Sequence, residues 1–457
     1  MKTRNPAVTK WVTLAVVAFT GGLITKLPYL RETYMNPLQE ATGANMTQLG
    51  ILMSAYGIVN FILYFPGGVL ADKFSTRKLI AISAFGTAAA GLWYWMMPGF
   101  VWLVVIHAIF AVTTVFTFWA AMVKSINGLG GPEEQGRLFG FLEGGRGLIG
   151  TVAALGSVAV FGWAADEIGG MKNAILYYSL LLIVAGILAL IFMEDKKPET
   201  KVATKVTDSL KWADVVEVAK MPRVWMAGVL GICNYSALIF HGYVTGYLSD
   251  AFGLSDTVVG NLSVIRTYFM MMIGALLAGF VADKIGSRIK FIKWAFVGMT
   301  IFASLYVIIP AGPKGIPLII ANFIVFGLCL YSIKALYFST IDEVLVPKRL
   351  AGTASGVISL VTYAPEIFLY TVSGAMVDKY IDTATPLQGY HNCFIAMAIL
   401  SAIGFVCGLL LLRMNRKAIA EKEAAEAAAL ADGAPVDDDA AAVVDNAVAA
   451  ADDAASE

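Results

Sequence analysis

Residues 68–73 read Gly-Val-Leu-Ala-Asp-Lys, and residues 279–284, which lie 211 positions later, read Gly-Phe-Val-Ala-Asp-Lys. A second repeated pattern, Arg-Leu-x-Gly-x-x-x-Gly, starts at Arg137 and again at Arg349, at an offset of 212. At that same offset, two further residues recur in the second half of the chain: Gly162 as Gly374 and Asp166 as Asp378. Matches at an almost constant offset indicate that the chain consists of two related halves.

The composition places these halves in a membrane. Of the 457 residues, 58% are hydrophobic and 14% are charged, whereas soluble domains carry roughly 25% charged residues. A helix needs about 20 apolar residues to cross a bilayer. Twelve segments meet this requirement: 11–36, 48–71, 79–97, 101–126, 137–165, 172–193, 223–249, 257–282, 291–310, 316–343, 350–378 and 390–412. The sequence therefore predicts an all-α membrane protein with twelve transmembrane helices in two six-helix pseudo-repeats.

The polar segments divide the chain further. We expect an N-terminal six-helix bundle over 1–193, a cytoplasmic linker over 194–222 and a C-terminal six-helix bundle over 223–412. Residues 413–457 are rich in alanine and acidic residues, so they cannot bury a core and are expected to form a disordered cytoplasmic tail.

The distribution of positive charge predicts the orientation. Most of the 33 lysines and arginines fall on one side of the predicted spans, and this side is cytoplasmic by the positive-inside rule. Both termini are then cytoplasmic. The short basic N-terminus leads into a long apolar segment with no cleavage site, which indicates a retained first span. We expect a multi-pass, monomeric protein of the inner (plasma) membrane that contacts lipid.

The loop after the second span carries a family motif. Residues 68–78 read Gly-Val-Leu-Ala-Asp-Lys-Phe-Ser-Thr-Arg-Lys and resemble the loop motif of the major facilitator superfamily, and the similarity extends over residues 1–412. The resemblance implies secondary transport by alternating access and a motif that locks the cytoplasmic gate. The gating residues are then Gly68, Asp72, Arg77, Asp283, Arg288, Arg137 and Arg349. A plain positively charged loop is the alternative.

Two further stretches are similar to the sugar-phosphate and organic-anion permease branch of this superfamily. They are residues 346–356, Val-Pro-Lys-Arg-Leu-Ala-Gly-Thr-Ala-Ser-Gly, and residues 28–30, Pro-Tyr-Leu. Phosphate antiporters of that branch pair arginines on the first and seventh helices. The seventh span departs from this pattern, because its ionisable residue within the membrane is His241 rather than an arginine. The resemblance therefore supports an organic anion and does not specify a phosphate ester.

Ionisable residues at bilayer depth are costly and usually face a cavity or a partner. The candidates for substrate binding are Lys26, Arg146, Arg266, Lys334, Glu366 and His241. Arg266 and Glu366 both lie near the midplane, where one arrangement is a neutral ion pair that is either structural or opened by the substrate. Gly21-Gly22 and Pro28 flank Lys26 and loosen the helix there. Two of these candidates have an alternative role. The Lys334 side chain could extend to the membrane interface, and His241 could make a hydrogen bond in the core.

No enzyme signature is present. The glycine-rich stretch 144–150 lies within a predicted helix and follows no strand, and there is no Walker A motif. The four cysteines have no paired spacing. We expect no metal, no cofactor and no nucleic-acid partner. The excess of cations within the spans favours a gradient-driven carrier of a small organic anion. A multidrug or cation exporter and a transporter-like membrane sensor are the alternatives.

Overall fold

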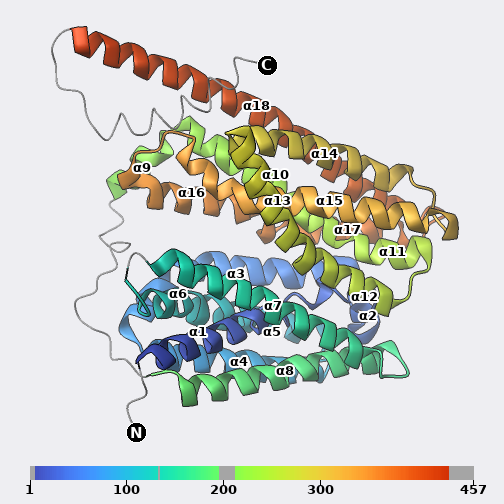
Figure 1. The fold of residues 1–457 in the computed structure, drawn as a ribbon. Coiled ribbons are helices and arrows are strands. Elements are labelled where there is room, and N and C mark those ends of the chain that lie inside the picture. Colours follow the sequence, from blue (N-terminus) through green and yellow to red (C-terminus); the bar gives the residue numbers. More distant parts are fainter. Residues whose placement is uncertain (1–5, 132–133, 195–211, 432–457) are drawn as a thin grey trace. The chain divides into compact units, whose positions relative to one another are not determined.

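A computed structural model describes residues 6–131, 134–194 and 212–431 (Figure 1). All regular secondary structure within these ranges is helical, with no strand among them. The predicted all-α class is therefore confirmed.

The helices follow one another with short connections. In the first half they are α1 (Pro6–Leu23), α2 (Met35–Thr42), α3 (Met46–Lys73), α4 (Thr76–Trp95), α5 (Phe100–Ala111), α6 (Ala120–Asn127), α7 (Gln135–Phe161) and α8 (Glu167–Phe192). In the second half they are α9 (Trp212–Ala219), α10 (Pro222–Gly242), α11 (Val244–Phe252), α12 (Asp256–Val264), α13 (Met271–Ile285), α14 (Arg288–Ile308), α15 (Ile316–Leu336), α16 (Ala351–Tyr363), α17 (Leu369–Ile381) and α18 (Gln388–Ala431).

Each of the twelve predicted spans contains helix. Ten helical segments of the described chain are long and apolar enough to cross a membrane. The other two predicted spans fall on α1, which contains the shorter apolar helix Val8–Leu23, and on α4. This arrangement is the one expected for twelve membrane-crossing helices.

Several spans lose regular α-helical geometry near the middle. The first predicted span was expected to reach residue 36, but α1 ends at Leu23 and turns lead into a 3-10 turn, η1 (Leu30–Glu32). Pro28 explains this early end, because proline lacks an N–H and disfavours helix at the preceding residue. Two π-helical segments, η2 (Val112–Trp119) and η4 (Ile265–Met270), interrupt other spans. Pro365 lies in a further break, the 3-10 turn η8 (Ala364–Ile367).

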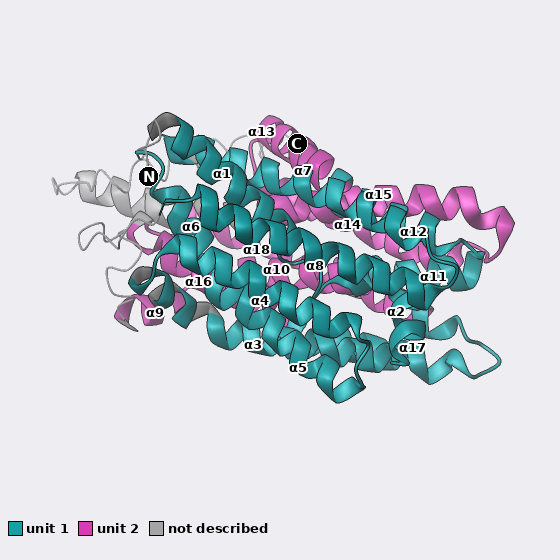
Figure 2. Ribbon diagram, turned by 90° about the horizontal axis from the view of Figure 1, so that it is seen from below, with its two compact units in different colours: residues 1–202, 242–269, 366–390 teal, residues 203–241, 270–365, 391–457 magenta. Residues whose placement is uncertain are grey.

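The chain forms two compact units (Figure 2). Unit 1 comprises residues 1–202, 242–269 and 366–390, and unit 2 comprises 203–241, 270–365 and 391–457. Unit 1 thus contains the first half of the sequence and two segments of the second half. The joins at 269–270 and 365–366 fall within η4 and η8, where the helices are irregular.

The polar segments are only partly described. Residues 195–211 of the predicted linker and 432–457 of the predicted tail lie outside the described ranges. The start of the tail is helical, because α18 continues to Ala431. Alanine, glutamate and lysine dominate this extension and are strong helix formers, which explains why helix continues beyond residue 412.

Candidate functional site

The irregular segment after α1 brings several ionisable groups into the interior of unit 1. Residues 24–34 leave the helical path at Leu23 and re-enter helix at Met35. Within this segment, Arg31 is buried and Glu32 is half-buried. Transporters place substrate groups at such discontinuous helices, because the break frees backbone groups to line a cavity. The segment is therefore the centre of the candidate site.

The Arg31 guanidinium lies between two tyrosine rings. Its central carbon is 4.6 Å from the ring centroid of Tyr243 and 5.0 Å from that of Tyr370. The residue is 2% exposed. Among the described residues, none of its three guanidinium nitrogens makes a well-formed hydrogen bond, although the Tyr243 hydroxyl and the Glu32 carboxylate interact with it electrostatically. Cation–π contacts offset part of the desolvation cost of the cation, but the planar set of donors remains available to an anion.

Arg266 pairs with a carboxylate of the irregular segment after α1. Its Nη2 donates to Oε2 of Glu32 at 2.9 Å, and the arginine is 1% exposed. The Ser263 hydroxyl donates to the Glu32 carbonyl at 2.5 Å and holds the turn against α12. The sequence did not suggest this partner. The early end of α1 turns Glu32 into the interior of unit 1.

Glu366 joins the same region through a tyrosine. It is 8% exposed, and its Oε1 accepts a hydrogen bond from the Tyr29 hydroxyl at 2.6 Å. A side chain at Gly57 of α3 would come within 2.9 Å of the Glu366 Cγ, so α3 approaches this carboxylate closely. Tyr29 also packs edge-on against Tyr56. The break after α1 and the break η8 thus meet at a tyrosine–carboxylate hydrogen bond.

Arg146 and Lys26 form a second cationic region of unit 1. Arg146 pairs with Glu143 at 2.5 Å, as their spacing on one helix predicts, and it lies 5.4 Å from the Trp119 ring centroid. A side chain at Gly21 would come within 2.9 Å of Arg146 Nε, so α1 and α7 approach closely here. Lys26 is half-buried in the irregular segment.

The two candidates in unit 2 have local partners. His241 is fully buried, stacks on Phe323 and Phe326, and is 3.0 Å from the Tyr306 hydroxyl through Nε2. This surrounding favours the core hydrogen bond over a role in binding. Lys334 is half-buried, and its ammonium lies 5.6 Å from the Tyr331 ring centroid.

The predicted gating residues make varied contacts. Arg77 donates to the carbonyl of Leu190 at the end of α8. Arg349 binds Glu217 of α9 at 2.5 Å and lies 3.5 Å from Asp214. Arg137 lies 5.9 Å from the Trp11 ring centroid.

The remaining members of this set are less defined. The Arg288 backbone N–H donates to Glu343 at 2.5 Å, and Asp283 is exposed. Gly68 and the side chain of Asp72 lie outside the described part of the structure, although α3 includes both positions. Within the described ranges, no three metal-ligating side chains converge to hold an ion.

The sequence reading missed Arg31 and Glu32. Both fall within the first predicted span, 11–36, and neither was among the candidates for substrate binding. The available signal was Pro28 with Gly21-Gly22, which predicts a broken helix, and hence that the residues after the proline turn inward.

A twelve-span helical fold with charged groups at interrupted helices is the architecture of a secondary transporter. The Major Facilitator Superfamily model matches residues 12–369, and the chain belongs to this family. It is a transporter family, so the chain is not an enzyme. Two solved transporter structures have a similar fold. The bacterial homologue of the human lysosomal transporter Spinster has a TM-score of 0.70 at 12% identity, covering 91% of this chain and 98% of that chain. The nucleoside transporter NupG has a TM-score of 0.67 at 16% identity, covering 90% and 99%.

Curated relatives are similar over most of their length. The inner membrane protein YihN of Escherichia coli K12 is 30% identical over 420 residues, which cover 92% of this chain and 99% of the relative. The hexuronate transporter of Bacillus subtilis 168 is 23% identical, covering 85% and 94%. The probable L-galactonate transporter of Escherichia coli K12 is 24% identical, covering 75% and 77%.

Proposed function

We propose that this protein carries a small organic anion, of the sugar-acid type, across the inner membrane by alternating access. The observation that carries the proposal is the Arg31 guanidinium, which is buried and makes no well-formed hydrogen bond among the described residues. A buried cation with unused donors is costly unless an anion completes it. A carboxylate fits this position because two of its oxygens match the guanidinium fork.

Arg266 is the second proposed anion-binding residue. It lies in the π-helical segment η4, and such segments frequently occur at functional sites. Its partner Glu32 is adjacent in sequence to Arg31, so both guanidinium groups meet at one turn. A substrate carboxylate at Arg31 would therefore lie beside a balanced ion pair. Lys26 and Arg146 of unit 1 are further candidates for contact with the substrate, and Glu366 and Tyr29 are candidates for contact with its hydroxyl groups.

The relatives support the substrate class. Two of them are named as transporters of a hexuronate and, as a probable assignment, of L-galactonate. Both compounds are carboxylates with several hydroxyl groups. A multidrug or cation exporter would need a net acidic site, and the cationic groups named above oppose it.

The proposal extends to topology. Both termini face the cytoplasm, the bundles 1–193 and 223–412 act as the two moving halves, and the protein works as a monomer. The positive-inside distribution of Lys and Arg supports the orientation, and the internal repeat supports the two halves.

Uptake by proteoliposomes tests the function. Radiolabelled glucuronate and galactonate are offered in turn, with competition by anionic, neutral and cationic solutes at a defined membrane potential. Uptake inhibited by carboxylates alone is the expected result. Competition only by neutral or cationic solutes would contradict the anion assignment and favour the exporter.

Variants of Arg31 test the site. Arg31→Lys keeps the charge but removes the fork, so KM should rise about 10- to 100-fold, the equivalent of a lost charge-assisted hydrogen bond. Arg31→Gln should reduce uptake further. Arg413→Lys is the matched control, because Arg413 is exposed on α18. An unchanged KM in Arg31→Lys would show that this guanidinium does not bind the substrate.

A further inference from the structure

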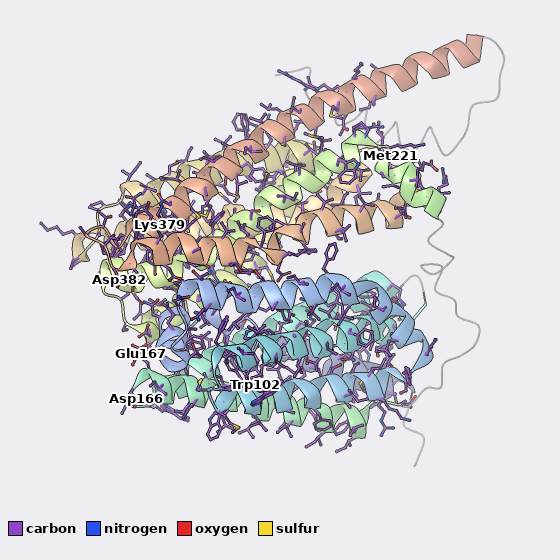
Figure 3. All side chains as sticks on the ribbon, turned by 180° about the vertical axis from the view of Figure 1, so that it is seen from behind. Trp102, Asp166, Glu167, Met221, Lys379 and Asp382 are labelled. Atoms are coloured by element: carbon purple, nitrogen blue, oxygen red, sulfur yellow. The ribbon has the colours of Figure 1, made fainter. Side chains whose placement is uncertain are left out.

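The Glu32 carboxylate lies in the interior of unit 1, unlike the acidic groups at the helix ends of that unit. Figure 3 shows Asp166 and Glu167 at the start of α8 and Asp382 directly after the end of α17. Asp166 and Asp382 are exposed to solvent, whereas Glu32 is half-buried within the irregular segment after α1. A carboxylate removed from water is costly unless charge or hydrogen bonds compensate it. The groups around Glu32 therefore have to account for its position.

Three contacts fix Glu32 in this position. Its Oε2 accepts a hydrogen bond from Arg266 Nη2 at 2.9 Å, and its backbone carbonyl accepts one from the Ser263 hydroxyl at 2.5 Å. The carboxylate also lies directly against the end of α10. A Cβ added at Gly242 would be 2.8 Å from Oε2 and 3.0 Å from Oε1, so a residue larger than glycine would displace the carboxylate. The negative charge of Glu32 is therefore held at a defined place.

Glu32 places an unused acceptor beside the unused donors of Arg31. Within the described ranges, Glu32 Oε1 is buried and makes no hydrogen bond, and the Arg31 nitrogens make no well-formed one. The guanidinium interacts electrostatically with this carboxylate. A hydroxylated carboxylate matches both groups, because its carboxylate accepts from Arg31 while one of its hydroxyls donates to Glu32.

Arg31, Arg266 and Glu32 together carry one positive charge in excess. Glu32 neutralises Arg266 through their ion pair, so the excess charge is that of Arg31. A single negative charge balances this group of three residues. A second negative charge on the same molecule would lose its hydration, would find no further cation in this group, and would be repelled by Glu32.

The other ionisable groups of the candidate site have contacts of their own. Arg146 pairs with Glu143 at 2.5 Å, and Lys26 interacts electrostatically with Arg146. Glu366 accepts a hydrogen bond from the Tyr29 hydroxyl at 2.6 Å. None of these contacts supplies a further cation to the turn that holds Arg31 and Glu32.

We propose that Glu32 is a specificity-determining residue that restricts the site to singly charged sugar acids and rejects dianions. The inference rests on the proposed carrier function and names the charge class of its substrate. A monoanion places its carboxylate on Arg31 and a hydroxyl on Glu32. A dianion brings a second charge that Glu32 repels, and such a repulsive group is an effective source of specificity.

Binding of a matched pair of sugar acids tests the inference on the wild-type protein. Galactonate and galactarate share one carbon skeleton and differ at the last carbon, which is an alcohol in galactonate and a second carboxylate in galactarate. Isothermal titration of the full chain in detergent measures both dissociation constants. Galactonate should bind about 10- to 100-fold more tightly than galactarate, as expected for one repelled and desolvated charge.

Two wild-type results would overturn the inference, and they differ in what else they refute. Equal affinities for galactonate and galactarate would remove the selection by charge and leave the carrier function standing. A lack of affinity for both compounds would refute the sugar-acid function and the inference together.

Variants of Glu32 show whether this residue is the cause. Glu32→Gln keeps the shape and an acceptor oxygen but removes the charge, so the preference for galactonate over galactarate should fall by about 10-fold or more. Glu32→Asp keeps the charge and should keep the preference. Glu134→Gln is the matched control, because Glu134 is exposed and pairs with Lys10, and it should leave both dissociation constants unchanged. An unchanged preference in Glu32→Gln would overturn the role of Glu32.

Thermal unfolding provides a second measurement that does not depend on a stable Glu32→Gln protein. A ligand that binds the folded state raises the Tm according to its affinity. At equal concentrations, galactonate should raise the Tm of the wild type more than galactarate does, and galactarate should have the larger effect on Glu32→Gln, whose unpaired cation it balances. The same order of the two ligands in both proteins would contradict the assignment of charge selection to Glu32.

Discussion

Replacing Glu32 by glutamine removes the carboxylate that pairs with Arg266 and leaves the guanidinium in the protein interior. The side chain of Arg266 is 2% exposed and that of Glu32 is 17% exposed, with 2.9 Å between the paired atoms. Breaking a buried pair by removing one partner costs about 3–5 kcal/mol. Since Glu32 retains some contact with solvent, we expect the lower end, about 3 kcal/mol.

The double variant Glu32→Gln/Arg266→Gln should recover most of this loss. It removes both charges, so neither the unpaired cation nor the unpaired carboxylate remains. Arg266→Gln alone should be destabilised as well, because Glu32 then lacks its cation. The expected coupling energy of the mutant cycle is about 2–3 kcal/mol, at the upper end of the range for residues in contact.

Equilibrium unfolding in mixed detergent and SDS micelles, followed by tryptophan fluorescence, measures the four free energies of the cycle. A second cycle, with Glu366→Gln in place of Glu32→Gln, tests the other pairing considered from the sequence and should give a smaller coupling energy. Strictly additive effects of Glu32→Gln and Arg266→Gln would refute the reasoning, since they would show that the pair contributes no interaction in the membrane protein.

Three further predictions concern packing and gating. Gly374→Ala should lower the free energy of unfolding by about 1–3 kcal/mol, because the added Cβ meets the Met46 carbonyl. Gly162→Ala, at the repeated position, should be close to neutral in the same unfolding assay, because the nearest atoms to its Cβ are 3.6 Å away. His241→Phe keeps the stack on Phe323 and Phe326 and removes the contact with Tyr306, so it should retain uptake and lose about 1 kcal/mol of stability; loss of uptake in a folded variant would contradict a purely structural role. Asp72→Asn should slow uptake at equal expression, since a charge near a helix terminus contributes about 0.3–2 kcal/mol, and unchanged kinetics would remove Asp72 from the gating set.

The positions of the helices could be predicted from the sequence. Twelve apolar segments of membrane-spanning length and a repeat at one offset are properties of short stretches, and they require no knowledge of which helix meets which. The short-range pair of Glu143 and Arg146 was predictable for the same reason, because residues three apart on a helix share a face.

The candidate site was predictable only in part. The kinds of residue could be proposed from the sequence, because an ionisable group at bilayer depth needs a partner wherever the chain folds. The partners themselves depend on contacts between distant segments. Arg266 pairs with Glu32 across 234 positions, and Glu366 meets Tyr29 across 337. Depth along a span gives no information on rotation about its axis, so two residues at equal depth need not face each other.

The sequence by itself determined that this protein is a duplicated helical membrane protein with cations at depth, because hydropathy and repetition are written along the chain. The tertiary structure decided which charges are balanced. It ends α1 at Leu23 and turns Arg31 and Glu32 inward, and it brings Asp378 onto the N-terminus of α3. The physical reason is that burial of a charge is settled by the groups that surround it in space, and these groups come from segments that no local pattern connects.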